Sequence, residues 1–286
     1  MRRKLKPIVV LIFFSLITLV MGVAYLKERQ LDKQVLQQAS QTIPIASLPS
    51  INPAPSSSAE EDIVELKPII DVSGWQLPSD MDYDTVSQHV SGVIVRVYGG
   101  SKITKNNNAS HTTGIDKSYK THITEFQKRG IPVAVYAYAL GTSEKEMREE
   151  AREFYKAASP YKPTFYWVDI EEETMSNMDQ GVKAFRDELK KLGAENVGLY
   201  IGTYFMTEQQ ISIDGFDAIW IPTYGGNTGY YDAAPQTDIE YHLHQYTDRG
   251  WIAGFNHDVD MNQIAPTQEN KLAIFKKLFG SLPSTN

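Results

Sequence analysis

The chain has 286 residues, of which 42% are hydrophobic and 22% are charged, so it can bury a sizeable core and is not a disordered protein. Its net charge is −7, and residues 66–286 hold 21 Lys and Arg against 29 Asp and Glu. This balance argues against a nucleic-acid partner, which requires a basic surface. The chain lacks cysteine, which excludes disulfides and thiol chemistry but does not identify the compartment.

The first 26 residues predict a membrane anchor. Residues 1–6 include four basic residues and precede an uncharged, mostly apolar run over 7–26. These 20 residues, rising about 1.5 Å each, match a hydrocarbon core of roughly 30 Å, and the basic flank stays cytoplasmic. We therefore expect a single-pass protein of the cell membrane, with the remaining chain outside. The alternative is a signal peptide cleaved near residues 22–24 (Gly-Val-Ala), which would release a secreted protein.

Residues 27–65 have the composition of a spacer. Residues 27–41 are polar and can extend the anchor helix as a short stalk, whereas residues 51–61 are rich in Pro, Ser and acidic residues. The latter composition is typical of linkers. We expect this segment to hold a single domain, residues 66–282, away from the membrane.

Strand and helix patterns alternate along that domain. Strands are predicted at 68–73, 92–98, 131–138, 163–171 and 197–202. Helices are predicted between them at 116–129, 143–158 and 177–192. Strands then follow at 218–224, 241–247 and near Val259, before a helix at 268–279. Alternation predicts a parallel sheet with right-handed crossovers. About eight strands predict a closed α/β barrel with its site at the C-terminal strand ends.

Asp169 and Glu171 end the apolar strand 163–171 and form the most informative pair of the sequence. Residues two apart in a strand point to the same face, so the two carboxyl groups share one side. Each negative charge raises the pKa of the other, and partial burial raises both. Such a pair can keep one carboxylic acid protonated while its neighbour is ionised, the combination that glycoside hydrolysis needs.

Further acidic, amide and aromatic side chains fall near the predicted C-terminal strand ends. Rings pack on the apolar faces of sugars, and carboxylates and amides bind their hydroxyl groups. The pattern therefore predicts a sugar site. Its other candidate residues are Asp71, Tyr136, Tyr138, Tyr200, Tyr224, Gln245, Tyr246 and Asp260.

Competing motifs are weak, and we expect neither a metal nor a cofactor. Residues 258–269 copy part of a calcium loop, but Gln263 replaces the glycine required at the sixth position and Pro266 interrupts the segment. The six histidines lack the spacing of metal ligands. The chain has no phosphate-binding loop and no nucleophile-elbow serine.

The domain resembles the glycoside hydrolase family 25 lysozymes, which are N-acetylmuramidases. The resemblance covers about residues 66–282 and depends on the order and spacing of several short motifs. They are residues 70–76 (IDVSGWQ), 168–171 (VDIE), 199–202 (LYIG), 219–224 (IWIPTY), 244–250 (HQYTDRG), 252–255 (IAGF) and 259–262 (VDMN). The resemblance implies a flattened, TIM-like (β/α)5(β)3 barrel that binds peptidoglycan glycan strands.

The resemblance also implies residue roles. Glu171 matches the general acid that protonates the glycosidic oxygen between N-acetylmuramic acid and N-acetylglucosamine. Asp169 matches the residue that assists the 2-acetamido group of the substrate as it attacks C1. Asp71 and Asp260 match two further acids of the cleft, and Trp75 is a candidate sugar contact within the first motif.

The sequence departs from the family pattern at three places around the expected site. Residues 99–101 read Gly-Gly-Ser where many members have Glu-Gly-Thr, residues 136–138 read Tyr-Ala-Tyr, and His244 stands where Trp is common. Two alternative functions therefore remain open. One is a wall-binding or scaffold domain with little turnover, and the other is a glucosaminidase or chitin-type glycosidase, which also uses Asp-x-Glu pairs.

Overall fold

The computed structural model of this protein describes residues 65–100 and 107–282. The predictions for the cytoplasmic segment, the membrane anchor and nearly all of the spacer concern residues 1–64, which lie outside this part of the chain. Within residues 65–100 and 107–282, none of the helices has the length and apolar character needed to span a membrane.

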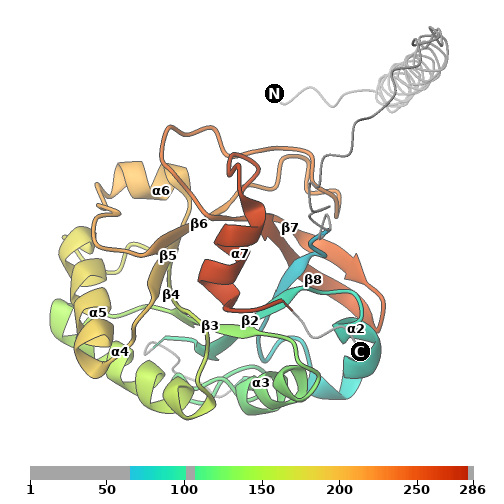
Figure 1. The fold of residues 1–286 in the computed structure, drawn as a ribbon. Coiled ribbons are helices and arrows are strands. Elements are labelled where there is room, and N and C mark those ends of the chain that lie inside the picture. The colour runs from blue at the N-terminus through green and yellow to red at the C-terminus, as the bar shows by residue number, and fades with distance from the viewer. Residues whose placement is uncertain (1–64, 101–106, 283–286) are drawn as a thin grey trace, which may run out of the picture. The chain divides into compact units, whose positions relative to one another are not determined.

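Eight strands close into a barrel in chain order (Figure 1). Strands β1 to β7 run parallel to their neighbours, and β8 closes the barrel by pairing antiparallel with both β7 and β1. The strands are β1 (Ile69–Val72), β2 (Gly92–Tyr98), β3 (Val133–Tyr138), β4 (Tyr166–Ile170), β5 (Val197–Ile201), β6 (Ala218–Pro222), β7 (Leu243–Ile252) and β8 (Phe255–Ile264). A closed barrel leaves no sheet edge unpaired.

An α-helix follows each of the first five strands, whereas no helix of the described chain separates β6, β7 and β8. This is the order of five β/α units and three closing strands that the resemblance implied. The helices are α2 (Tyr83–Ser87), α3 (Tyr119–Lys128), α4 (Glu144–Ala158), α5 (Met178–Leu192), α6 (Thr203–Glu208) and α7 (Lys271–Phe279). Two single 3-10 turns occur at η1 (Pro78–Asp80) and η2 (Ser159–Tyr161).

Local signals explain the helices that the sequence predicted. The Ser143 hydroxyl accepts a hydrogen bond from the Glu146 backbone N–H at the start of α4, which satisfies one of the helix's free donors. Gly193 ends α5 with φ of 104°, a conformation that favours glycine. The short helices α2 and α6 were not predicted, since five and six residues are too few to show a helical hydrophobic period.

The last two strands are longer than predicted and form one hairpin. The strand near Val259 is the ten-residue β8, and β7 extends to Ile252. Three register shifts interrupt the pairing of β7 with β8. Bulges of this kind break the strict alternation of apolar and polar residues by which a strand is recognised. The sequence therefore predicted strands that are shorter than those of the hairpin.

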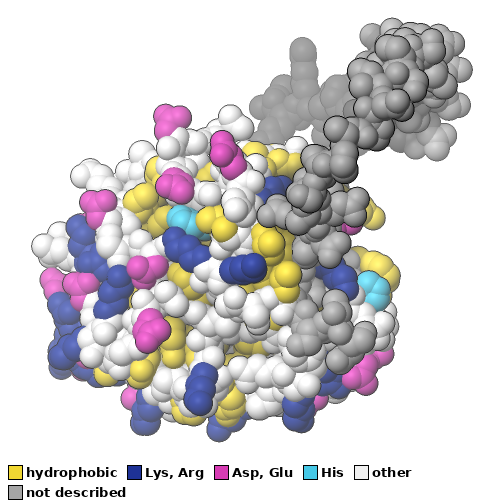
Figure 2. All heavy atoms as spheres, in the orientation of Figure 1, with side chains coloured by type: hydrophobic (Ala, Val, Ile, Leu, Met, Phe, Trp, Pro, Cys, Tyr) yellow, Lys and Arg dark blue, Asp and Glu magenta, His cyan; other side chains and the backbone are white. Residues whose placement is uncertain are grey.

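The barrel has an apolar interior at one end, opposite the strand ends where a site is expected. The interior cluster contains Trp167 and Phe165 and is covered by Phe275, Leu278 and Phe279 of α7. Figure 1 shows α7 lying across this end of the barrel. The face around α7 carries intermixed acidic and basic side chains (Figure 2). A second apolar cluster packs the outer helices on the barrel, so only the other end of the barrel interior is left for polar groups.

Candidate active site

A cavity of about 370 Å³ opens at the C-terminal ends of the strands, within the volume range of small-molecule sites. Arg96 is the single Lys or Arg of the described residues that line it. Five acidic residues also line the cavity, namely Asp71, Asp169, Glu171, Asp248 and Asp260. The cavity therefore carries an excess of negative charge.

The structure brings together most of the residues that the sequence predicted for a site. All four predicted acids line the cavity. Five of the seven predicted sugar contacts do so as well, namely Trp75, Tyr136, Tyr200, Tyr224 and Gln245. These residues come from β1, β3, β4, β5, β7 and β8 and from the loops that follow β1, β4 and β6, so the barrel closure is what assembles them.

Tyr138 and Tyr246 are not part of the cavity lining. The Tyr138 hydroxyl donates a hydrogen bond to Glu172, beside the cavity. Tyr246 follows Gln245 in β7 and points to the opposite face, because side chains alternate along a strand. There its ring packs against Tyr231, with ring centroids 6.3 Å apart, and lines a separate groove.

Besides the apolar Val72, five lining residues were not singled out from the sequence. Arg96 carried the clearest signal, a charged residue within the apolar strand β2. Asp248 and Gln76 lay inside motifs of the resemblance without an assigned role, and Ser73 and Trp220 did so too. Their contribution depends on which way each side chain points, and only the folded barrel decides this.

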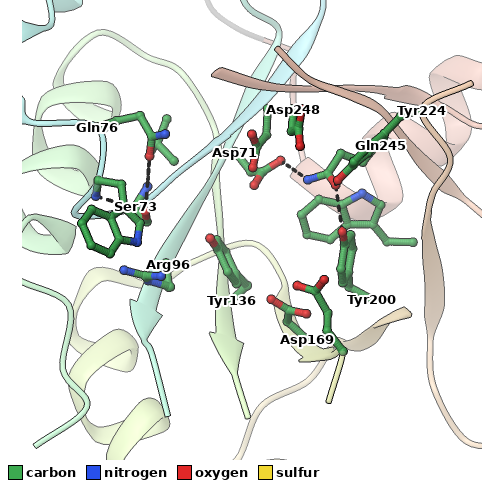
Figure 3. Close-up of a pocket in the computed structure, with 15 residues that line it drawn as sticks. Asp71, Ser73, Gln76, Arg96, Tyr136, Asp169, Tyr200, Tyr224, Gln245 and Asp248 are labelled. Carbon is green, nitrogen blue, oxygen red and sulfur yellow. Dashed lines mark hydrogen bonds between the residues drawn. The ribbon is translucent and has the colours of Figure 1, made fainter. Parts of the chain in front are cut away.

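Gln245 is the centre of a hydrogen-bond network on the cavity wall (Figure 3). Its side-chain oxygen accepts hydrogen bonds from the hydroxyls of Tyr200, at 2.8 Å, and Tyr224, at 2.5 Å. Its amide nitrogen donates to Asp71 at 2.8 Å. Both acceptor positions of the oxygen and one of the two N–H donors are therefore used in one orientation of the amide, which holds Asp71 in place.

Asp71 and Asp260 form one carboxyl pair. Burial raises the pKa of Asp71, while hydrogen bonds from Asn262, Gln245 and Asp260 oppose this rise. Burial also raises the pKa of Asp260 well above its ordinary value, and the negative charge of Asp71 adds to this. Asp260 can thus stay protonated and donate a hydrogen bond to Asp71. Asp71 keeps its negative charge because Asn262, Gln245 and Asp260 all donate hydrogen bonds to it.

Asp169 and Glu171 form the second pair. Burial raises the pKa of Asp169 well above its ordinary value, and the charge of Glu171 and a hydrogen bond with it raise it further. Glu171 lies just past the end of β4 and is more exposed. Partial burial at the cavity raises its pKa, the hydrogen bond that it accepts from Asp169 lowers it, and the charges of Asp71 and Glu172 raise it. The pair therefore holds a shared proton at higher pH than an isolated carboxyl group would.

Arg96 is anchored behind the cavity by a buried carboxylate. Its guanidinium contacts Asp116 Oδ2 at 3.0 Å, and the two side chains are 12% and 0% exposed. Asp116 also accepts hydrogen bonds from the backbone N–H groups of Gly74, at 2.7 Å, and Ser118, at 2.8 Å. Asp116 therefore ties the loop that carries Trp75 to the floor of the cavity.

We predict that Asp116→Ala destabilises the protein strongly. The substitution leaves the Arg96 charge and two backbone N–H donors without their partner, which costs about 3–5 kcal/mol of unfolding free energy. Urea denaturation measures this. The matched control is Asp84→Ala, which removes an ion pair with Arg129. The Asp84 side chain is 80% exposed, so this substitution should cost at most about 1 kcal/mol of unfolding free energy. Equal losses for the two variants would contradict the prediction.

Comparisons with known proteins agree with this geometry. The family model described as glycosyl hydrolases family 25 matches residues 70–255. One similar solved structure is that of GHIP, a glycosyl hydrolase 25 of Streptococcus pneumoniae participating in host cell invasion. Its sequence is 54% identical to this chain, and the match covers 75% of this chain and 93% of GHIP with a TM-score of 0.73. No curated protein matches the sequence significantly.

More distant structures share the fold. The catalytic domain of endolysin ply40 from bacteriophage P40 of Listeria monocytogenes is 27% identical, with a TM-score of 0.63, and covers 76% of this chain and 98% of that domain. The autolysin LytC of Streptococcus pneumoniae, solved in complex with a synthetic peptidoglycan ligand, is 22% identical, with a TM-score of 0.54, and covers 68% of this chain and 46% of LytC. The chain therefore belongs to glycosyl hydrolase family 25.

Proposed function

We propose that this protein is an N-acetylmuramidase that cleaves the β-1,4 bond between N-acetylmuramic acid and N-acetylglucosamine in peptidoglycan. The observation that carries the proposal is the Asp169–Glu171 pair, whose pKa values are both raised at the mouth of an acidic cavity. The association of relatives with bacterial glycan supports the substrate class, since ply40 is an endolysin and LytC was solved with a peptidoglycan ligand.

The proposed reaction uses the two carboxyl groups differently. Glu171 donates its proton to the glycosidic oxygen as the bond from that oxygen to C1 breaks. The carbonyl oxygen of the substrate's 2-acetamido group attacks C1, and ionised Asp169 stabilises the positive charge that develops on this group. Water then opens the cyclic intermediate while Glu171 accepts a proton, which returns both carboxyl groups to their starting state.

We propose further that the protein acts at the outer face of the cell membrane. The basic segment 1–6 and the apolar run 7–26 support an anchor with the barrel facing the cell wall. An anchored enzyme would remodel the wall of its own cell, because it cannot diffuse away. Protease protection of whole cells, compared with lysed cells, tests the orientation, and a barrel protected in whole cells would contradict it.

Product analysis tests the proposed activity. Purified protein is incubated with peptidoglycan, and the products are reduced with borohydride and analysed by mass spectrometry. Reduced muramic acid at the new ends supports the muramidase, whereas reduced glucosamine would assign a glucosaminidase. Wall binding without any fragments would favour a scaffold domain.

We predict a bell-shaped pH dependence of kcat/KM that lies above the ordinary carboxyl range. The active form has Asp169 ionised and Glu171 protonated, so the proton that Asp169 donates toward Glu171 in the free pair lies on Glu171 in this form. Activity therefore falls at low pH as Asp169 becomes protonated and at high pH as Glu171 loses its proton. Both limbs move upward from the ordinary values of 3.8 and 4.5, because burial raises both pKa values. Initial rates over a pH series measure the profile, and two limbs at the ordinary values would contradict it.

Arg96 gives this profile a specific test. Its positive charge lowers the pKa of Asp169. We therefore predict that Arg96→Met moves the acidic limb to higher pH, whereas Arg96→Lys, which keeps the charge, leaves it near its original position. A merely structural role of Arg96 would lower the rate at all pH values without moving the limb.

A further inference from the structure

The four tryptophans of the chain divide into two classes. Trp167 and Trp220 are 0% and 2% exposed and belong to the barrel interior. Trp75 and Trp251 are 59% and 70% exposed. Trp75 lines the cavity, whereas Trp251 lies near the end of β7 and has no role in the site described above.

The pairing of β7 with β8 decides which face Trp251 occupies. Its neighbours Gly250 and Ile252 are buried, and their partners across the hairpin are Val259 and Phe255. Ile252, Val259 and Phe255 all belong to the outer apolar cluster. The register shifts between Gly250 and Ile252, but both residues still pair with members of that cluster, so Trp251 between them points to the opposite face.

That opposite face is the one from which the hairpin contributes to the cavity. Asp260 follows Val259 and lines the cavity, so it points away from the outer cluster, as Trp251 does. Gly250 pairs with Val259, and a strand rises about 3.3 Å per residue. Trp251 therefore lies about two residues, or roughly 7 Å, beyond Asp260 along the hairpin.

Two polar side chains accompany Trp251 on this face. Asn256 and Asp258 are exposed and alternate with Phe255 and Val259 along β8, so they share the face of Asp260. An aromatic ring flanked by an amide and a carboxylate is suited to a sugar, since the ring packs on its apolar face and the polar groups bind its hydroxyls.

The hairpin tip is tied to residues 80–82, which holds the backbone that carries Trp251. The backbone N–H of Asp82 donates to the Gly254 carbonyl at 2.8 Å, and His257 lies 3.7 Å from Asp80. Gly254 has φ of 93°, and a Cβ there would lie 2.9 Å from the Asp82 carbonyl oxygen. This close approach requires glycine. An exposed ring on a rigid element loses little conformational entropy when it binds.

We propose that the β7–β8 hairpin extends the cavity into a longer groove and that Trp251, with Asn256 and Asp258, binds a sugar of the glycan strand beyond those held in the cavity. This inference rests on the proposed function, because it assigns a second contact to the same polymer. A polymer running along the hairpin face from Asp260 reaches Trp251 next. The protein would thus favour long glycan strands over short ones.

The test compares long and short glycans with the full chain. Binding of peptide-free glycan strands and of a tetrasaccharide is measured by calorimetry in a Glu171→Gln background, which prevents turnover. Adding Trp251→Ala should weaken binding of long strands about tenfold, as expected for one buried aromatic contact, and leave tetrasaccharide binding unchanged. Trp251→Phe should retain most of the affinity.

Leu192→Ala is the matched control, because Leu192 is a 36% exposed apolar residue at the end of α5, just before β5 and thus at the opposite end of the barrel. Unchanged long-strand affinity in the Trp251→Ala variant would overturn the inference, and so would an equal loss with both glycans or no binding of long strands. Failure of the proposed function is distinguishable, because it would appear as an absence of cleavage by the unsubstituted protein.

Discussion

Glu171→Gln is expected to abolish glycan cleavage. Glutamine preserves the size of the side chain but cannot donate a proton to the leaving oxygen, and loss of a general acid lowers rates by about 10²–10⁴-fold. The fold should be unaffected, because Glu171 lies beyond the end of β4 and its side chain is exposed. Release of reducing ends from purified peptidoglycan measures the rate, and thermal unfolding checks the fold.

Glu172→Gln is the matched control for this variant. Glu172 is adjacent and also exposed, but it accepts a hydrogen bond from Tyr138 and is not among the residues that line the cavity. Its substitution should leave cleavage within a few fold of the original rate. Cleavage at the original rate by Glu171→Gln would remove Glu171 as the acid, and equal losses in both variants would indicate a general charge effect.

Asp169→Asn is expected to slow cleavage by about 10²–10³-fold without removing it completely. Asparagine can still accept a hydrogen bond from the acetamido group, but it has no negative charge to stabilise the charge that develops there. The loss should appear in kcat with little change in KM, since the interaction strengthens only in the transition state. Steady-state kinetics on a soluble glycan measure the two constants.

Two outcomes would contradict this role of Asp169. Unchanged kinetics would show that the charge is not used. A large rise in KM at constant kcat would make Asp169 a simple binding group. Asp84→Asn serves as the control, because the Asp84 side chain is 80% exposed on α2 and belongs to another ion pair. It should leave both constants unchanged.

The sequence by itself determined the fold class and the central acids. Alternating strand and helix patterns are local properties, so the barrel and its long helices could be predicted from the order of apolar and polar residues. The spacing of Asp169 and Glu171 was equally informative, because neighbours two apart in a strand share a face in any fold. Their position at the end of an apolar strand pointed to the C-terminal end of the barrel.

Only the tertiary structure decided how distant residues act together. Gln245 reaches Asp71 across 174 positions of sequence, a contact that exists because β8 closes the barrel between β7 and β1. The faces that Tyr246 and Trp251 occupy depend on how β7 pairs with β8 across the register shifts of the hairpin. The role of Arg96 depends on a carboxylate 20 residues away. Such features follow from register and packing between strands, which local residue patterns do not specify.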